Sequence, residues 1–226
     1  MALTKVSDGT VKEQGLLAAE EINQNILYLF IKRLMDMFGA SCGIVLLLPV
    51  FIIVAILIKL EDPKGPVFFK QIRVGKDGRE FGMYKFRSMV TDAEERLKDL
   101  LQRNEVSGAM FKMKDDPRVT KIGRFIRKTS IDELPQLLNV LKGDMSLVGP
   151  RPPLLREVKE YTSYDKQRLL VTPGCTGLWQ VSARNSVGFN EMVKLDLEYI
   201  QNRNVIYDMK IIIKTIKVVC SSQNGY

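Results

Sequence analysis

The sequence contains no histidine. This absence excludes Ser-His-Asp and Cys-His catalysis and histidine-ligated zinc. It also removes the side chain that most often serves as a general base at neutral pH. Any acid–base or nucleophilic chemistry must therefore rest on Asp, Glu, Lys, Tyr or a metal-bound water.

Cysteine and the common nucleotide motifs are also scarce. The three cysteines, Cys42, Cys175 and Cys220, lie far apart and form neither a C-x-x-C pair nor a disulfide framework. Their spacing favours a reducing, cytosolic setting for the polar part of the chain. No G-x-G-x-x-G or G-x-x-x-x-G-K-[ST] occurs, so nucleotide binding, if present, requires another arrangement.

The charge is strongly basic, with 34 Lys and Arg against 26 Asp and Glu and a net charge of +8. Such a surface favours nucleic acid, anionic membranes or phosphorylated ligands. We expect no nucleic-acid partner, because there is no zinc-finger spacing or aromatic–basic strand and the basic residues are spread along the chain. The remaining partners are membrane lipid and phosphorylated ligands.

One long uncharged run covers residues 37–58 and is long enough to cross a bilayer as a helix, which takes about 20 apolar residues. Pro49 interrupts it, and basic residues flank both ends, Lys32 and Arg33 before and Lys59 after. A spanning helix is usually basic on its cytoplasmic side only. The pattern predicts a re-entrant membrane helix hairpin over residues 26–60, broken at Pro49, with a kinked span as the alternative. Residues 1–25 are a polar lead-in.

A second candidate membrane segment covers residues 206–220. Lys210, Lys214 and Lys217 follow helical spacing on one stripe, and apolar residues fill most of the remainder. An amphipathic helix of this kind lies in a membrane interface. The same pattern fits a core helix with solvated lysines, and both interpretations stay open.

The middle of the chain predicts an α+β fold that is mainly α with a small β-hairpin. The hairpin pairs residues 66–74 with 79–86 across a glycine-containing turn. Helices are expected near residues 91–103, 117–128, 131–142, 153–171 (with a break at Ser163), 190–202 and 206–220. Residues 61–226 are expected to form one cytosolic domain that ends in the amphipathic helix.

Two adjacent carboxylates, Asp132 and Glu133, follow Arg127 and precede Pro135. One interpretation is structural: Ser130 and Glu133 match a capping box at a helix start. The other is chemical. A proline such as Pro135 destabilises a helix little only in its first turn. A helix starting just before Pro135 would place Asp132 at an exposed helix N-terminus. The helix dipole and Arg127 would keep it ionised there, as a nucleophile or metal ligand requires.

A series of ordered motifs extends from about residue 31 to residue 218. They are Lys32-Arg33-x-x-Asp36, Gly65-Pro66-Val67-Phe68, Tyr84-Lys85-Phe86-Arg87-Ser88-Met89, Asp116-Pro117-Arg118, Ser130-x-Asp132-Glu133-Leu134-Pro135-Gln136, Asn139-Val140-Leu141-Lys142-Gly143-Asp144-Met145-Ser146, Val148-Gly149-Pro150-Arg151-Pro152, Pro173-Gly174-x-Thr176-Gly177-Leu178-Trp179-Gln180 and Arg184. With these motifs the chain resembles the bacterial sugar transferase family, the monotopic phosphoglycosyl transferases, in its minimal catalytic form.

The resemblance implies transfer of a sugar 1-phosphate from a UDP-sugar to undecaprenyl phosphate, with release of UMP and a requirement for Mg²⁺. It places such an enzyme on the cytoplasmic face of the inner membrane, at the start of lipid-linked glycan assembly. Asp132 would be the covalent nucleophile and a metal ligand, beside Glu133. The phosphate and nucleotide contacts would fall to Lys85, Arg127, Arg151 and Arg184.

Two other functions remain as alternatives: a non-catalytic membrane-surface binding module and a polyprenyl-diphosphate phosphohydrolase. The first leaves the carboxylate pair among arginines unexplained. The second predicts release of inorganic phosphate without a lipid-linked sugar. The sequence leaves open which UDP-sugar is used, which glycan pathway is served and whether the chain forms a homodimer.

Overall fold

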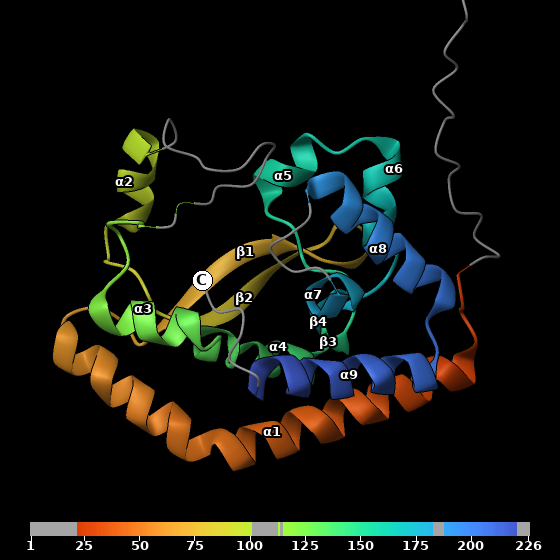
Figure 1. Ribbon diagram of the computed structural model, residues 1–226, viewed down its shortest axis with the longest axis horizontal. Helices are drawn as coiled ribbons and strands as arrows, with labels where there is room; N and C mark the ends of the chain where they lie inside the picture. Colours follow the sequence, from red (N-terminus) through yellow and green to blue (C-terminus); the bar gives the residue numbers. More distant parts are fainter. Residues whose placement is uncertain (1–21, 101–112, 114, 183–187, 221–226) are drawn as a thin grey trace, which may run out of the picture.

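A computed structural model describes residues 22–100, 113, 115–182 and 188–220. The helix α1 forms the base of the molecule, and the other elements stack on one side of it (Figure 1). In chain order the elements are α1 (Ile26–Glu61), β1 (Phe68–Val74), the 3-10 turn η2 (Lys76–Gly78), β2 (Glu80–Phe86), α2 (Ala93–Leu100), α3 (Lys121–Lys128), the 3-10 turn η4 (Ile131–Glu133), α4 (Gln136–Lys142), β3 (Ser146–Val148), α5 (Leu155–Lys159), α6 (Ser163–Lys166), the 3-10 turn η5 (Gln167–Leu170), β4 (Gly174–Thr176), α7 (Leu178–Ser182), α8 (Phe189–Asn202) and α9 (Val205–Cys220). The predicted α+β class, mainly α with a small β-hairpin, is confirmed.

Helix α1 begins at a capping residue, Asn25, whose side chain accepts hydrogen bonds from the N–H groups of Leu27 and Tyr28. Within the described part of the chain, it is the one helix long and apolar enough to cross a membrane. Only 11% of its most apolar stretch of 18 residues is buried. The expected break at Pro49 is a bend inside one continuous helix (Figure 1), not a turn between two helices. A proline removes one backbone hydrogen bond and bends a helix without necessarily ending it.

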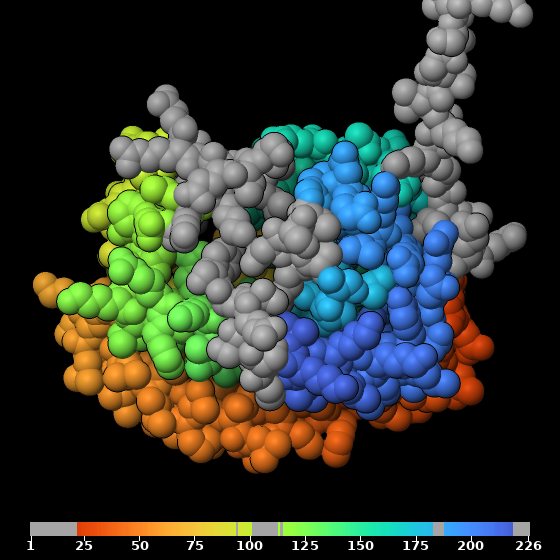
Figure 2. Space-filling model, in the orientation of Figure 1, coloured from red at the N-terminus to blue at the C-terminus, as the bar shows by residue number. Residues whose placement is uncertain are grey.

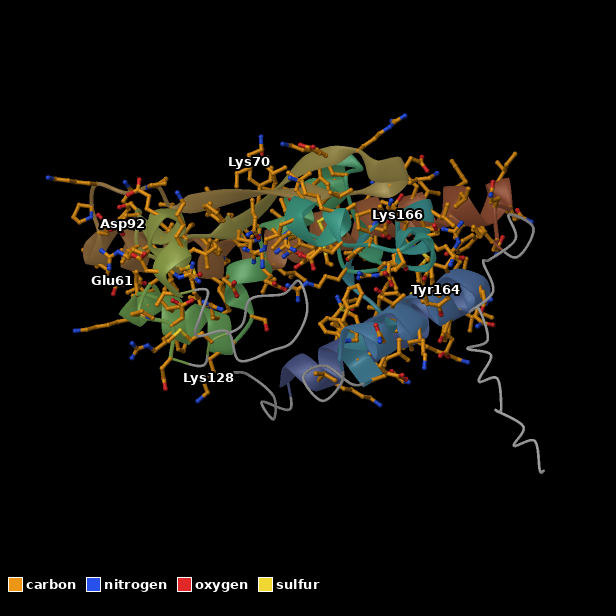
Figure 3. The ribbon with its side chains drawn as sticks, turned by 90° about the horizontal axis from the view of Figure 1, so that it is seen from above. Glu61, Lys70, Asp92, Lys128, Tyr164 and Lys166 are labelled. Atoms are coloured by element: carbon orange, nitrogen blue, oxygen red, sulfur yellow. The ribbon has the colours of Figure 1, made fainter. Side chains whose placement is uncertain are left out.

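Both ends of α1 are attached to the same globular body. Before its first turn, Asn23 exchanges hydrogen bonds with Arg203: the Asn23 amide donates to the Arg203 carbonyl at 3.1 Å, and the Arg203 guanidinium donates to the Asn23 carbonyl at 2.6 Å. At its last residue, the Glu61 carboxylate accepts from two backbone N–H groups at the start of α3, at 2.7 and 3.1 Å. Seen from above, Glu61 lies at the same end of the molecule as Lys128, the last residue of α3 (Figure 3).

The basic residues at the start of α1 are part of this attachment. The buried Lys32 ammonium donates to Asp208 of α9 at 2.9 Å and to the Tyr199 hydroxyl of α8 at 3.3 Å. Arg33 donates to two carbonyls of α4, at 2.6 and 2.8 Å. Buried charges are stable only when paired in this way, so these side chains dock α1 onto the domain.

The predicted β-hairpin is present, with Phe68 opposite Phe86 and Val74 opposite Glu80. A second sheet was not predicted: β3 and β4 form a short parallel pair. A Cβ atom at Gly174 would lie 2.0 Å from the backbone nitrogen of Gly149. Only glycine permits this approach, and it fixes the start of the Pro150-Arg151-Pro152 segment.

The remaining helices follow the predictions with shifts. The expected helix over 153–171 is divided into α5, α6 and η5, because Thr162 and Asp165 form a capping box that starts a new helix at Ser163. The far end of the helix expected over 91–103 lies outside the described residues. Helix α7 was not among the expected helices.

Helix α9 combines the two alternatives considered for it. Asp208 and Ile211 are buried against the domain, as in a core helix. The opposite side is exposed and carries both lysines and apolar side chains. The exposed apolar set is Ile206, Met209, Ile213 and Ile216. Figure 2 shows α9 directly above α1, and the two helices are in contact. Both helices carry exposed apolar side chains.

Candidate active site

The two adjacent carboxylates lie in the short 3-10 turn η4 between α3 and α4. Glu133 N–H bonds to the Ser130 carbonyl and Leu134 N–H to the Ile131 carbonyl, and α4 begins only at Gln136. The expected helix over 131–142 is therefore shorter. Pro135 has no N–H group to continue the α-helical hydrogen bonds back into η4.

The predicted capping box is wrong. Ser130 has a φ of 57°, in the left-handed region, and its side chain makes no capping hydrogen bond. The placement of Asp132 is also corrected: it is 8% exposed rather than displayed at an open helix N-terminus. The Asp132-Glu133 turn therefore has no helix-capping role.

Glu133 is paired with a cation from the hairpin. The Lys85 ammonium of β2 donates to Glu133 Oε1 at 2.7 Å. Alternation along the strand turns Lys85 toward η4. The structure thus brings together two residues that are far apart in the sequence and that were both predicted for the site.

Burial and charge set the two carboxylates apart. Burial raises the pKa of Asp132 to about 6; Lys85 and Arg127 oppose that rise and Glu133 adds to it. Partial burial opposes ionisation of Glu133 as well, but Lys85 and Arg151 outweigh it and lower its pKa to about 2. The expectation that Arg127 and the helix dipole dominate at Asp132 is corrected. Asp132 is nonetheless largely ionised at pH 7, but its surroundings stabilise the ionised form less than they do for Glu133.

Beside Glu133 lies a cavity of about 60 Å³ whose lining includes three cationic side chains and one carboxylate, that of Glu133. Lys85 and Arg151 line it, as does Arg73 of β1, a residue that no sequence motif indicated. Arg73 is buried; it donates to the Pro152 carbonyl at 2.9 Å and, through two nitrogens, to Gln71 Oε1 at 2.7 and 3.2 Å. Burial, and then the neighbouring Arg151, lower the pKa of Arg73 to about 10, which still leaves it charged at neutral pH.

A buried ion pair, Arg168 with Asp196, holds the backbone of Arg151 in place. Arg168 donates to Asp196 Oδ2 at 2.7 Å and to the Arg151 carbonyl at 3.2 Å. The Arg151 guanidinium lies 5.8 Å from the centre of the Trp179 ring. In this cation–π arrangement the ring face of Trp179 lies against the guanidinium of Arg151.

Two further parts of the predicted site are Arg184 and a bound metal ion. Arg184 lies outside the described residues. For a metal, the described residues contain no group of three acidic, cysteine or histidine side chains. Mg²⁺ is, however, commonly held by one or two carboxylates together with substrate phosphates and waters. Asp132 and Glu133 fit that donor set.

The chain belongs to the bacterial sugar transferase family, whose model matches residues 27–222. It is 53% identical over 193 residues to the galactosyl transferase CpsE of Streptococcus agalactiae serotype III, covering 85% of this chain and 42% of that protein. It is 45% identical over 201 residues to the undecaprenyl-phosphate galactose phosphotransferase of Salmonella typhimurium, covering 87% of this chain and 42% of that protein. It is 41% identical over 199 residues to the exopolysaccharide production protein ExoY of Rhizobium meliloti, covering 86% and 88%. The chain thus spans less than half of the first two relatives and most of the third.

Proposed function

We propose that this chain transfers a sugar 1-phosphate from a UDP-sugar to undecaprenyl phosphate and releases UMP, starting the assembly of a lipid-linked glycan. The observation that carries the proposal is the Asp132-Glu133 turn beside a small cavity lined by Lys85, Arg73 and Arg151. Membership of the bacterial sugar transferase family supports it, and so do the activities in the names of two similar proteins, a UDP-galactose-lipid carrier transferase and an undecaprenyl-phosphate galactose phosphotransferase.

The reaction proceeds in two displacements. An Asp132 carboxylate oxygen attacks the phosphorus that bears the sugar; the new O–P bond forms as the bridging O–P bond breaks, and UMP leaves with that electron pair. A phosphate oxygen of undecaprenyl phosphate then attacks the same phosphorus and frees the Asp132 carboxylate. The products are a lipid-linked diphosphosugar and UMP. A carboxylate nucleophile suits a chain without histidine.

The cationic side chains have an electrostatic role. A diphosphate repels a carboxylate until its charge is neutralised, and preorganised cations do this at little reorganisation cost. Lys85, Arg73 and Arg151 surround the cavity beside Glu133, and Arg127 acts on Asp132. Arg184 is proposed as a further nucleotide contact on the family resemblance alone.

Mg²⁺ is the proposed cofactor, with Asp132 as a ligand and Glu133 beside it. When bound, it would neutralise phosphate charge and orient the diphosphate. The residues of the chain supply the rest: Glu133, kept ionised and paired with Lys85, preserves a second negative group next to Asp132. The observation that supports the cofactor is the adjacent pair of carboxylates, not a preformed cage.

We further propose that α1 enters the membrane from the cytoplasmic face of the inner membrane and returns to that face. The supporting observations are the exposed apolar side chains along α1, its bend, and the attachment of both its ends to one globular body. A straight span would separate the Asn23 end from the Glu61 end. The exposed apolar side of α9 would then rest in the interface next to α1.

The decisive experiment is a screen of UDP-sugars with undecaprenyl phosphate and Mg²⁺, reading both UMP and the lipid product. The names of the relatives place UDP-galactose and UDP-N-acetylgalactosamine first in the screen. The proposal requires UMP and lipid-linked sugar in equal amounts. No UMP with any donor would support a non-catalytic binding module. Inorganic phosphate released from a polyprenyl diphosphate would support a phosphohydrolase.

A further inference from the structure

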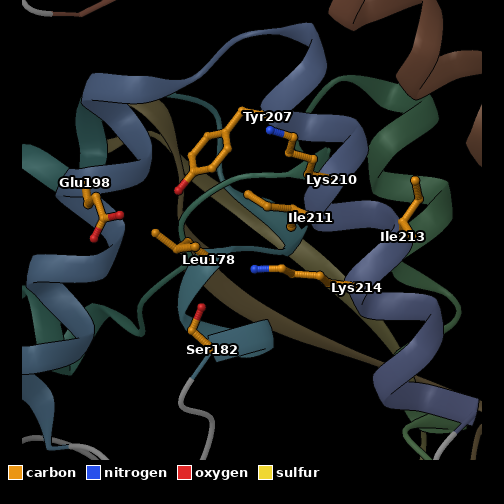
Figure 4. Close-up of a pocket in the computed structure, with 8 residues that line it drawn as sticks. All are labelled: Leu178, Ser182, Glu198, Tyr207, Lys210, Ile211, Ile213 and Lys214. Atoms are coloured by element: carbon orange, nitrogen blue, oxygen red, sulfur yellow. The ribbon is translucent and has the colours of Figure 1, made fainter.

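A second cavity, of about 460 Å³, lies between α7, α8 and α9 (Figure 4). Buried Leu178 and Ile211 give it an apolar floor. Helix α7 separates it from the active site: Leu178 and Ser182 line this cavity, whereas Gln180 on the same helix lines the cavity beside Glu133. It is therefore a different site from the one described above.

The rim of this cavity is polar and net positive. Lys210 and Lys214, one helical turn apart on α9, extend toward α7 and α8 (Figure 4). No described side chain forms an ion pair with either ammonium group. The hydroxyl-bearing side chains of Ser182 and Tyr207 lie at the same rim, and Glu198 of α8 faces the lysines. Two ammonium groups against one carboxylate favour an anion that also carries hydrogen-bonding groups.

The cavity opens next to the surface proposed to face lipid. On α9 the neighbouring side chains Met209 and Ile213 are 42% and 50% exposed. Helix α1, which packs along α9, adds further exposed apolar side chains. Lysines bordering an apolar surface in this way suit the headgroup level of a membrane.

We propose that this cavity binds the headgroup of one anionic phospholipid. The phosphate lies between the ammonium groups of Lys210 and Lys214, and Glu198 accepts hydrogen bonds from headgroup hydroxyls. The acyl chains leave along the exposed apolar side of α9. The site is not one for undecaprenyl phosphate, because the acceptor phosphate must reach the phosphorus at Asp132, on the other side of α7. The inference rests on the membrane placement proposed above, and only the exclusion of undecaprenyl phosphate uses the proposed transfer reaction.

The test uses the full chain in nanodiscs of phosphatidylcholine with and without phosphatidylglycerol, followed by release of the protein and native mass spectrometry. We expect one retained phosphatidylglycerol. A Lys210→Gln/Lys214→Gln variant should lose it, with affinity at least about tenfold weaker, since each lysine near an anionic surface contributes about fivefold to binding. The matched control, Lys194→Gln/Lys217→Gln, removes two exposed charges outside the cavity and should retain the lipid.

Three results would overturn the inference. Equal loss in both double variants would mean diffuse electrostatic attraction rather than a site. Retention in the Lys210→Gln/Lys214→Gln variant would place the lipid elsewhere. Displacement of phosphatidylglycerol by undecaprenyl phosphate would assign the cavity to the acceptor. Because binding is read by mass without turnover, a failed transfer assay and a failed lipid site give separate results.

Discussion

The side-chain oxygen of Asn139 accepts a hydrogen bond from the backbone N–H of Tyr84 at 2.9 Å, which joins α4 to β2. The amide nitrogen of Asn139 also donates to the Gly82 carbonyl at 2.8 Å. Asn139 is fully buried. Next to Tyr84, Lys85 reaches Glu133, just before α4. Asn139 therefore sets the spacing between the strand that carries Lys85 and the turn that carries Glu133.

Replacing Asn139 with Ala should leave the part-buried Tyr84 N–H and Gly82 carbonyl without their Asn139 partner. The expected loss is about 1–3 kcal/mol of unfolding free energy for each group, measured by urea denaturation. Asn202→Ala removes only an exposed hydrogen bond and should change stability by less than about 0.5 kcal/mol. Equal stability of Asn139→Ala and Asn202→Ala would contradict the role of Asn139.

Asp132 is predicted to carry the phosphosugar. Incubation with UDP-sugar and Mg²⁺, without lipid acceptor, should increase the mass of the protein by one phosphosugar. Asp132→Asn should abolish the adduct and turnover, because an amide is a poor nucleophile. Glu133→Gln should still form the adduct but more slowly, since it weakens the pair with Lys85. Full activity of Asp132→Asn would reject the mechanism.

The raised pKa of Asp132 also predicts a pH-dependent stability. A folded-state pKa of about 6, against an ordinary value of 3.8, means that the protonated carboxyl is favoured by the fold. The contribution of this carboxyl to the free energy of unfolding is complete below about pH 4. It falls by on the order of 3 kcal/mol as the pH rises through about 6. Asp132→Asn should therefore be more stable than the wild type at pH 7 and similar to it at pH 4, in denaturation curves recorded with EDTA. A constant difference between the two pH values would contradict the prediction.

Arg73 is predicted to contact the diphosphate of the donor. Arg73→Lys keeps the charge but cannot bond Gln71 and the Pro152 carbonyl together. The loss of one charge-assisted hydrogen bond should lower kcat/KM for the UDP-sugar about ten- to a hundredfold. Arg79→Lys, an exposed change at the end of the same hairpin, is the control and should be neutral. An unchanged kcat/KM in Arg73→Lys would remove Arg73 from the site.

The placement of α1 is tested by cysteine labelling in membrane vesicles, in a variant without Cys42, Cys175 and Cys220. Single cysteines introduced near residues 25 and 65 should label from the same side. Pro49→Ala restores a backbone hydrogen bond and should shift part of the population toward a spanning orientation. Opposite sidedness of the two sites in the protein with Pro49 intact would exclude the re-entrant arrangement.

Local patterns in the sequence were sufficient for much of this molecule. The hairpin around η2, the α9 pattern and the new helix at Ser163 follow from side-chain periodicity and turn or capping residues within a few positions. The ordered motifs indicated the family and, by resemblance, selected Lys85, Asp132, Glu133 and Arg151 for one candidate site; Lys85, Glu133 and Arg151 line one cavity. These features depend on residues that are close in the chain or on a family resemblance, and the linear sequence shows both.

Other features depended on backbone conformation or on contacts between distant segments. Ser130 matches a capping box, yet Pro135 and the left-handed conformation of Ser130 give a separate turn instead. Arg73 carried no signal as a site residue, because only the packing of β1 against the Pro152 segment brings it beside Glu133. The β3–β4 pair joins strands too short to stand out from their surroundings.

What the sequence determined by itself was the set of chemical groups: no histidine, two adjacent carboxylates, several arginines and one long apolar segment. What only the tertiary structure decided was their environment. The burial of Asp132 reverses the expected direction of its pKa, and Lys32 becomes an internal link to Asp208 rather than a free membrane-flanking charge. The reason is physical: residue type fixes which charges and donors exist, whereas desolvation and pairing depend on which segments the fold packs around them.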